Sequence, residues 1–221
     1  FLSLVADQLK KSLVDASLVG LSTPFDGGID EAVIALTKTP TYLFQDFWGE
    51  INTFFGGKPD SVFVLDEYAK ALNKKKYMVA SHIVGSPKHS AYAQLNFSKI
   101  KKEIRERFGL STKLPTIGYF GQALHGMTGY QISVNIFIQT LKRLDGYQLI
   151  VKPHPRESSQ EKEFLRALFQ DANLKYSFAE EASVEDLIPA CDVVCSMFSN
   201  CNFDACYINW FSSEGGCVPL S

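Results

Sequence analysis

Polar residues suited to holding an anion follow three apolar runs in the second half of the chain. The runs are LPTIGYF, LIVK and CDVVC, and each has the composition of a buried strand. The residues at their ends combine cations, small residues and hydrogen-bond donors: Gly121, Gln122, Lys152, His154, Pro155, Arg156, Ser196, Ser199 and Asn200. The carboxyl ends of parallel strands meet at one edge of a sheet, where ligands bind. The pattern therefore predicts a site for a nucleotide mono- or diphosphate.

Each residue type has a physical reason to serve such a site. Gly121 lets the backbone approach a phosphate closely, because no side chain stands in the way. His154 supplies one N–H as a neutral imidazole and two when protonated, and the prolines on either side restrict where the ring points. Ser199 and Asn200 precede a helix-like segment, whose free N–H groups can hold an anion.

Each segment taken alone also has a purely structural explanation. The His-Pro sequence is typical of a turn, and a serine before a helix is a common cap. GYFGQ lacks the lysine of a phosphate-binding loop and the full dinucleotide fingerprint. It is the combination of the three segments that favours a ligand site. LIVKPHPRESS lies between the other two in the chain, and we expect it to form the middle strand end.

The elements that position these residues alternate between strand and helix. In the second half, strands are expected at 114–122, 147–155, 174–180 and 191–196, with helices between them and over 202–210. The first half has a helix at 1–14 followed by strands, turns and helices with short links. Such alternation favours a mainly parallel sheet and an α/β fold. We expect two Rossmann-like domains, at 1–97 and 115–221, joined by a charged linker helix over 98–114.

The composition excludes several classes of protein. Of the 221 residues 46% are hydrophobic, and 22 Lys and Arg face 24 Asp and Glu, for a net charge of −2. The chain therefore has no basic field that would attract nucleic acid. No apolar run has the roughly 20 residues of a membrane span. The chain begins at Phe1 rather than with Met, so we expect a partial chain.

The five cysteines contain no CxxC pair and have no nearby histidine, which argues against a zinc site. An odd number of cysteines in apolar surroundings favours buried, reduced thiols and a cytoplasmic protein.

YFGQ, LIVKPHP and DLIPACDVVCSMFSN resemble the C-terminal half of GT-B glycosyltransferases, which have two Rossmann-like domains. The nearest likeness is to bacterial sialyl- and polysialyltransferases, CDP-glycerol polymer transferases and capsule-sugar transferases, which carry a His-Pro motif and a later Ser-Ser/Thr motif. The resemblance covers Thr116 to Cys206 well and the first half loosely, which implies an incomplete N-terminal domain. Non-hydrolysing UDP-GlcNAc 2-epimerases share this scaffold.

The resemblance implies roles for particular residues. His154 and Pro155 match the motif that contacts the nucleotide phosphate. Ser196 and Ser199-Asn200 stand where the serine motif does, although Met197 and Phe198 interrupt it. Asp204 stands where such enzymes place an acid for the ribose, and it is one methylene shorter than the usual Glu.

A general base is expected from the first half. Sialyltransferases carry an acidic-acidic-Gly element there, and the nearest equivalent is Phe25-Asp26-Gly27-Gly28, which has a single acid. Asp26 is the first candidate and Asp46, beside Trp48, the second; their structural alternatives are a turn acid and a helix cap. Such a base would deprotonate an acceptor hydroxyl while the phosphate-binding loops stabilise the departing nucleotide. GT-B enzymes generally need no bound metal, so none is expected.

The leading hypothesis is a glycosyltransferase that moves a sugar from a CMP-, CDP- or UDP-linked donor to a cell-surface or capsule glycan. Peripheral association with a membrane is compatible with that role. Two alternatives remain open: a UDP-sugar 2-epimerase, and a nucleotide- or glycan-binding module without catalysis.

Overall fold

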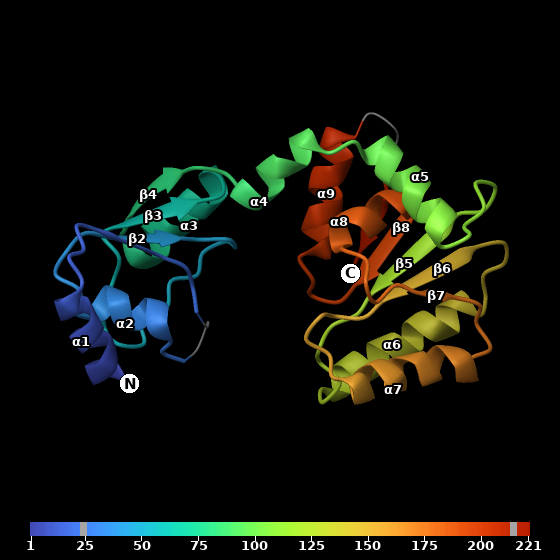
Figure 1. Ribbon diagram of the computed structural model, residues 1–221, viewed down its shortest axis with the longest axis horizontal. Helices are drawn as coiled ribbons and strands as arrows, with labels where there is room; N and C mark the ends of the chain where they lie inside the picture. Colours follow the sequence, from blue (N-terminus) through green and yellow to red (C-terminus); the bar gives the residue numbers. More distant parts are fainter. Residues whose placement is uncertain (23–25, 213–215) are drawn as a thin grey trace. The chain divides into compact units, whose positions relative to one another are not determined.

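The computed structural model describes residues 1–22, 26–212 and 216–221. The chain divides into two compact units, residues 1–90 and 91–221 (Figure 1). Each unit is an α/β body built on a parallel sheet, so the expected fold class is confirmed.

The first unit contains a four-stranded sheet in which neighbouring strands are consecutive in the chain. All pairs are parallel, in the order β1 (Ser17–Val19), β2 (Thr41–Phe44), β3 (Ser61–Val64) and β4 (Ala80–Ile83). The described part of this unit also contains the helices α1 (Leu2–Lys11), α2 (Ile29–Leu36), α3 (Glu67–Tyr77) and the short α4 (Pro87–Ser90).

Strand alternation determines the core of the first unit. Leu43, Val62 and Val64 are almost fully buried and pack with Ile34 of α2 and Ala69 of α3. The carboxylate of Asp66 accepts a hydrogen bond from the Ala69 N–H at 2.8 Å and so caps the start of α3.

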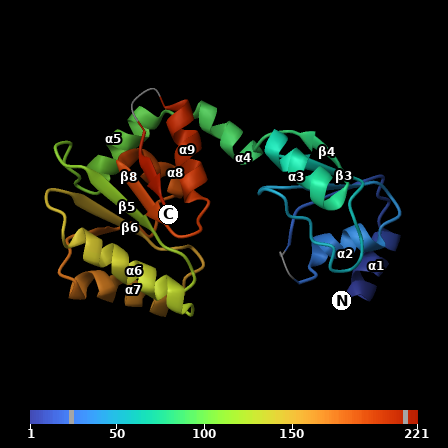
Figure 2. The ribbon, with the colours of Figure 1, turned by 180° about the vertical axis from the view of Figure 1, so that it is seen from behind.

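The second unit contains a five-stranded parallel sheet with a different winding. Its strands are β5 (Thr116–Phe120), β6 (Gln148–Lys152), β7 (Ser177–Phe178), β8 (Val193–Ser196) and β9 (Val218–Leu220). Their order across the sheet is β7-β6-β5-β8-β9. Figure 2 shows β6, β5 and β8 next to one another. The chain runs outward from β5 through β6 to β7 and then returns to the other side of β5. This is a doubly wound sheet, and its winding reverses between β5 and β8.

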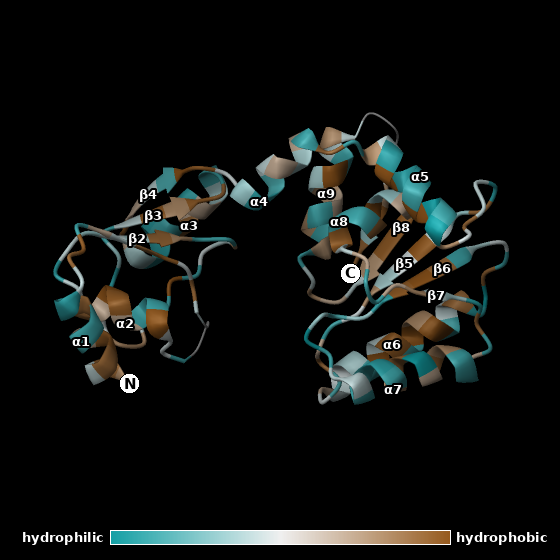
Figure 3. Cartoon of the chain, in the orientation of Figure 1, coloured by the Kyte–Doolittle hydropathy of each residue, from teal (hydrophilic) through white to brown (hydrophobic). Residues whose placement is uncertain are grey.

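Helices cover both faces of this sheet, which explains why all five residues of β5 are buried. The helices are α5 (Phe97–Arg107), α6 (Thr128–Leu141), α7 (Ser159–Asp171), α8 (Val184–Leu187) and α9 (Cys201–Phe211), with short 3₁₀ turns η1 (Ala91–Gln94) and η2 (Ile188–Ala190). Brown, hydrophobic residues occur along β5, β6 and β8, whereas α7 shows many hydrophilic residues (Figure 3).

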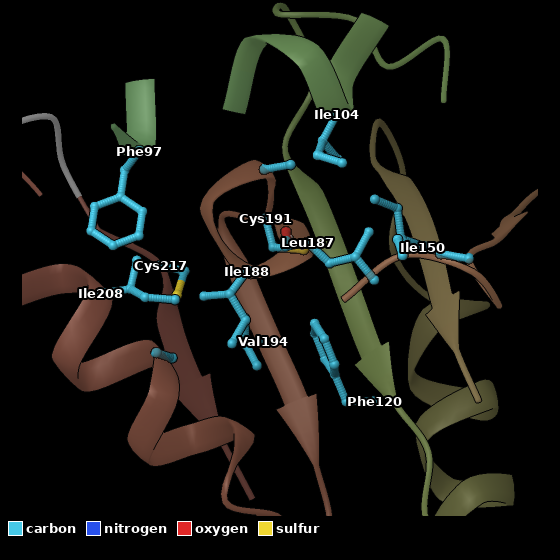
Figure 4. Packing of buried hydrophobic residues seen from close by; sticks show 14 of the residues in the cluster. Phe97, Ile104, Phe120, Ile150, Leu187, Ile188, Cys191, Val194, Ile208 and Cys217 are labelled. Carbon is cyan, nitrogen blue, oxygen red and sulfur yellow. Dashed lines mark hydrogen bonds between the residues drawn. The ribbon is translucent and has the colours of Figure 1, made fainter. Parts of the chain in front are cut away.

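Two apolar clusters hold the helices to opposite faces of the second sheet. Tyr119 and Val151 face α6 and α7, where they meet Val134, Ile138 and Leu165. On the other face, the strand residues Phe120, Ile150 and Val194 pack with Ile104 of α5, Leu187 of α8, Ile188 of η2 and Ile208 of α9 (Figure 4).

Two local features differ from the sequence-based expectations. The strand β9 was not predicted; it contains Pro219 and lies at the edge of the sheet, where a missing N–H is tolerated. Cys191 and Cys217 are buried as expected, but Cys195 and Cys201 are half-buried and Cys206 is exposed. Helix α5 contributes Phe97 and Ile104 to a hydrophobic cluster of the second unit, and its role as a linker remains a prediction.

The proposed domain limits at 97 and 115 remain a prediction. Within the ranges that the structure describes, none of the helices combines the length and apolar character that crossing a membrane requires.

Candidate nucleotide site

One row of the second sheet brings the three predicted strand ends together. Phe120 at the end of β5 is in register with Lys152 of β6 on one side and with Ser196 of β8 on the other. The segments that follow these three residues therefore start at the same edge. The middle strand is β5, so the expectation that LIVKPHPRESS would be the middle strand end was wrong. The reversal of winding lies between Gly121 and the segment after Ser196.

Gly121 is held tightly by its neighbours. Its N–H donates to the carbonyl of Lys152 at 2.8 Å. A β-carbon at this position would lie 3.1 Å from Oε1 of Glu157 and 3.4 Å from the Lys152 carbonyl oxygen. Close packing against Glu157 is thus one reason for a glycine here, in addition to the expected approach of a phosphate. The N–H of Gln122 donates to the hydroxyl of Tyr130 at 3.0 Å.

His154 lies in a tight turn between β6 and α7. Its Nδ1 accepts a hydrogen bond from the Arg156 N–H at 3.1 Å, and its carbonyl accepts one from the Glu157 N–H at 3.0 Å. Burial, with the nearby charges of Arg156 and Lys152, lowers the pKa of His154 below its ordinary value. The ring is therefore a neutral imidazole whose proton sits on Nε2, because Nδ1 is an acceptor. It offers one N–H donor to a ligand.

The other residues of this turn differ in exposure. Pro155 and Arg156 are exposed, whereas Lys152 is 7% exposed. The Nζ of Lys152 donates to the carbonyl of Glu180 at 2.6 Å, which ties β6 to the segment after β7. Burial, followed by the charge of Lys162, lowers the pKa of Lys152. One of its three donors is thus already committed within the protein.

The segment after β8 combines hydroxyl groups with an unusual backbone. Ser196 is buried and its hydroxyl donates to Oδ1 of Asn202 at 3.2 Å. The Ser199 hydroxyl accepts from the N–H of Cys201 at 3.2 Å, at the start of α9. Asn200 is the N-cap residue, but its side chain makes no capping hydrogen bond. Phe198, which lies between Ser196 and Ser199 in the chain, has a φ of +47° and is 86% exposed.

Asp204 lies in the first turn of α9 and points into the protein. It is 2% exposed, and one of its oxygens accepts the hydroxyl proton of Tyr92 at 2.9 Å. Burial, followed by the charge of Asp204, raises the pKa of Tyr92. This arrangement links η1 to α9, and a contact between Asp204 and a ribose remains a prediction.

The two candidate bases lie in the first unit. Asp26 follows β1 and Asp46 follows β2, and both residues are exposed. The carbonyl of Asp26 accepts a hydrogen bond from Nδ2 of Asn52 at 2.8 Å. Phe25 of the quoted FDGG motif lies outside the described residues. The roles of both acids remain predictions.

The nearby acids Asp30 and Glu31, which were not considered from the sequence, organise the loop before α2. Glu31 accepts from the N–H groups of Ser22 at 3.1 Å and Gly28 at 2.8 Å, while Asp30 accepts from that of Gly20 at 3.2 Å. Their oxygens therefore hold the backbone that carries Asp26.

Sequence reasoning also missed a buried pair beside Gly121. Glu157, directly after Arg156, and His125, in the loop after β5, approach to 3.4 Å between Oε1 and Nε2. Burial raises the pKa of Glu157 above its ordinary value. The sequence contains a signal for the glutamate alone, since an acid next to a predicted phosphate-binding turn is unexpected. Nothing in the sequence links it to His125.

Comparisons with known proteins agree on the architecture. No protein-family model and no curated protein matches the chain by sequence. Among solved structures, the chain is similar to a UDP-GlcNAc 2-epimerase from Methanocaldococcus jannaschii, solved in complex with UDP-GlcNAc and UDP, with a TM-score of 0.64 and 15% identity over 99% of this chain and 63% of that one.

It is also similar to the Anabaena protein HepE, solved in complex with UDP and glucose, with a TM-score of 0.56 and 13% identity over 94% of this chain and 61% of that one. A third similar structure is a glycosyltransferase from Rickettsia africae, with a TM-score of 0.50 and 13% identity over 88% and 54% of the two chains. The chain thus spans between half and two-thirds of these proteins. At such identities the likeness concerns the fold, which is a GT-B-like α/β fold with two parallel sheets.

Proposed function

We propose that this chain supplies the nucleotide-sugar site of a glycosyltransferase acting on a cell-surface or capsule glycan. The observation that carries the proposal is the row formed by Lys152, Phe120 and Ser196. It starts three polar segments at one edge of a doubly wound sheet, beside the point where the winding reverses. Ligands of such sheets bind at that place, outside the carboxyl ends of the strands.

The diphosphate of the donor would be held by neutral and backbone donors rather than by a metal. The Nε2–H of His154 would donate to a phosphate oxygen, and the positive end of the dipole of α9, an 11-residue helix, would attract the same anion. Arg156 would add a positive charge from the surface. These donors would stabilise the negative charge that develops on the departing nucleotide.

The acceptor hydroxyl would lose its proton to an acid of the first unit. Asp26 is the first candidate for this base and Asp46 the second, since both follow strands of the first sheet and are exposed. Replacing each by Asn separates the two: transfer to an acceptor should be lost with only one of the variants, while binding of the donor nucleotide is kept.

A UDP-linked donor is favoured over CMP- and CDP-linked ones. Two of the similar structures were solved with UDP, and this supports the same nucleotide here. Calorimetric titration with UDP, CDP and CMP in parallel tests the choice. UDP should bind most tightly, and His154→Ala should weaken it by about 10- to 100-fold, since a hydrogen bond to a charged group contributes about 1.5–3 kcal/mol.

The matched control is His82→Ala, which removes an exposed histidine from β4 of the first unit. This variant should bind UDP like the unchanged protein. If none of the three nucleotides binds, or if both histidine variants lose affinity equally, the proposed site is wrong.

A UDP-sugar 2-epimerase is the second candidate, because the structure with a TM-score of 0.64 is such an enzyme. Incubation with UDP-GlcNAc in the absence of any acceptor distinguishes the two. Epimerised product would support the second candidate, and slow release of UDP and free sugar would support the transferase. Binding of UDP with no turnover of any kind would instead favour a non-catalytic binding module.

A further inference from the structure

Two titratable side chains are enclosed together beneath the candidate nucleotide site. The side chain of Glu157 is fully buried and that of His125 is 10% exposed, and Oε1 and Nε2 lie 3.4 Å apart. The ring of His125 packs edge-on against the rings of Tyr130 and Phe164, with centroid distances of 5.2 and 5.8 Å. Neither side chain can reach a ligand at the surface.

Burial of this pair costs the folded protein free energy. Among the described residues, neither oxygen of Glu157 and neither ring nitrogen of His125 has a hydrogen-bond partner. Burying polar groups without such partners costs free energy, and apolar residues of similar volume would pack here at lower cost. Packing alone therefore does not explain why a glutamate and a histidine occupy this place.

The positions of Glu157 and His125 suggest a reason for the pair, because each residue belongs to a different loop of the candidate site. Glu157 ends the His-Pro turn, and its N–H holds the carbonyl of His154 at 3.0 Å. Its Oε1 also fills the space beside Gly121. His125 lies in the loop after β5, and its carbonyl accepts a hydrogen bond from Nε2 of Gln131 on α6 at 2.7 Å.

We propose that Glu157 and His125 are a pair of positioning residues that fix the His-Pro turn against the loop after β5. Their contact sets where the Nε2–H of His154 points relative to the loop after β5, so that this donor is held toward the phosphate. The inference rests on the proposed function for the identity of that phosphate, and the pair itself does not touch the nucleotide. Small displacements of such donors are enough to weaken binding strongly.

A thermodynamic cycle with His154 tests the proposal. UDP affinity is measured for the unchanged protein, Glu157→Ala, His154→Ala and the double variant. Glu157→Ala should weaken UDP binding by about tenfold or more, but in the His154→Ala background it should change affinity by less than about twofold. If Glu157 acts only on general stability, Glu157→Ala should weaken UDP binding by the same factor in both backgrounds. That result would overturn the proposal.

Two further variants keep the test independent of folding. Glu157→Gln preserves the shape of the side chain and its contact with His125, so it should bind UDP within about twofold of the unchanged protein. His125→Leu should weaken UDP binding as Glu157→Ala does, because it breaks the same contact from the other loop. Affinity equal to that of the unchanged protein in His125→Leu would contradict the pairing.

A readout without nucleotide separates this inference from the proposed function. The chain has four histidines, whose ring resonances can be assigned by single substitutions. Without UDP, the His154 resonance should shift in Glu157→Ala and return in Glu157→Gln, while that of His82 stays in place. If UDP binds but the His154 resonance does not respond to Glu157→Ala, the positioning role is wrong and the binding site stands. If the resonance responds as expected but no nucleotide binds, the proposed function is wrong and the positioning role of Glu157 is supported.

Discussion

The Nε2 of His125 lies 3.4 Å from Oε1 of Glu157, although one residue follows β5 and the other follows β6. This contact joins the two loops that leave neighbouring strands at the candidate nucleotide site. It places a carboxyl group with a raised pKa directly behind the turn that carries His154. We therefore expect the stability of the second unit and the geometry of its predicted site to depend on the same buried residues.

Replacing Glu157 by Gln should make the protein relatively more stable as the pH rises. The pKa of Glu157 in the folded state is raised, mainly by burial and also by Glu161, while the backbone of His154 and the ring of His125 act in the opposite direction. The folded state then binds this proton more tightly than the unfolded state does. The stability from this group is complete below the unfolded pKa of about 4.3 and is lost as the pH rises through the folded pKa.

Urea denaturation between about pH 4 and about pH 7 measures this effect. The free energy of unfolding of Glu157→Gln, relative to the unchanged protein, should increase over this range. Glu163→Gln is the control, because Glu163 lies on the same helix with a side chain that is 71% exposed. A difference that stays constant or decreases with pH for Glu157→Gln would show that burial does not dominate.

Replacing Gly121 by Ala should destabilise the protein by about 1–3 kcal/mol, the usual cost of an extra methyl group in a packed region. The new β-carbon would lie 3.1 Å from Oε1 of Glu157. In a Glu157→Ala background the cost should fall by at least about 0.5 kcal/mol, because the two positions are in contact. Gly126→Ala, in the same loop and with open space around it, is the control. Equal costs in both backgrounds would mean that Gly121 does not pack against Glu157.

Replacing Phe198 by Gly should stabilise the protein. Phe198 has φ +47°, a left-handed conformation that costs a residue with a β-carbon about 1–2 kcal/mol. Glycine removes this cost, although its greater freedom in the unfolded chain destabilises the folded state by about 0.5–1 kcal/mol. Phe198→Ala keeps the β-carbon and loses little contact, since the side chain is 86% exposed, so it should show no such gain in thermal denaturation. Equal stabilities of the Gly and Ala variants would exclude strain at this position.

Replacing Tyr130 by Phe should destabilise the second unit by about 1–3 kcal/mol, the cost of leaving a buried donor unsatisfied. The hydroxyl of Tyr130 accepts from the N–H of Gln122 at 3.0 Å and from the hydroxyl of Tyr119 at 3.1 Å. Tyr68→Phe removes a hydroxyl from an exposed tyrosine of α3 and should leave the denaturant midpoint unchanged. If both variants unfold at the same midpoint, the hydroxyl of Tyr130 does not hold the Gln122 N–H.

Local elements of the second unit could be predicted because their signals lie within a few residues. The apolar runs before Gly121, His154 and Ser196 correspond to β5, β6 and β8. The hydroxyl of Ser183, directly before α8, accepts from the N–H of Asp186 at 3.1 Å and caps this short helix. Strand alternation and helix caps arise from the backbone geometry of neighbouring residues, so the sequence alone is enough to place them.

The tertiary structure decided how these elements combine. It placed β5 rather than β6 in the middle of the three strand ends, and it added β9 at the edge. It also turned Asp204 inward to Tyr92 and brought His125 to Glu157. These relationships join residues that are distant in the chain, and the short-range patterns of apolar and polar residues that predict strands and helices contain no information about which distant partner each will meet. The sequence by itself determined the polar strand ends, and only the packing of the sheet and its helices decided which of them lie together.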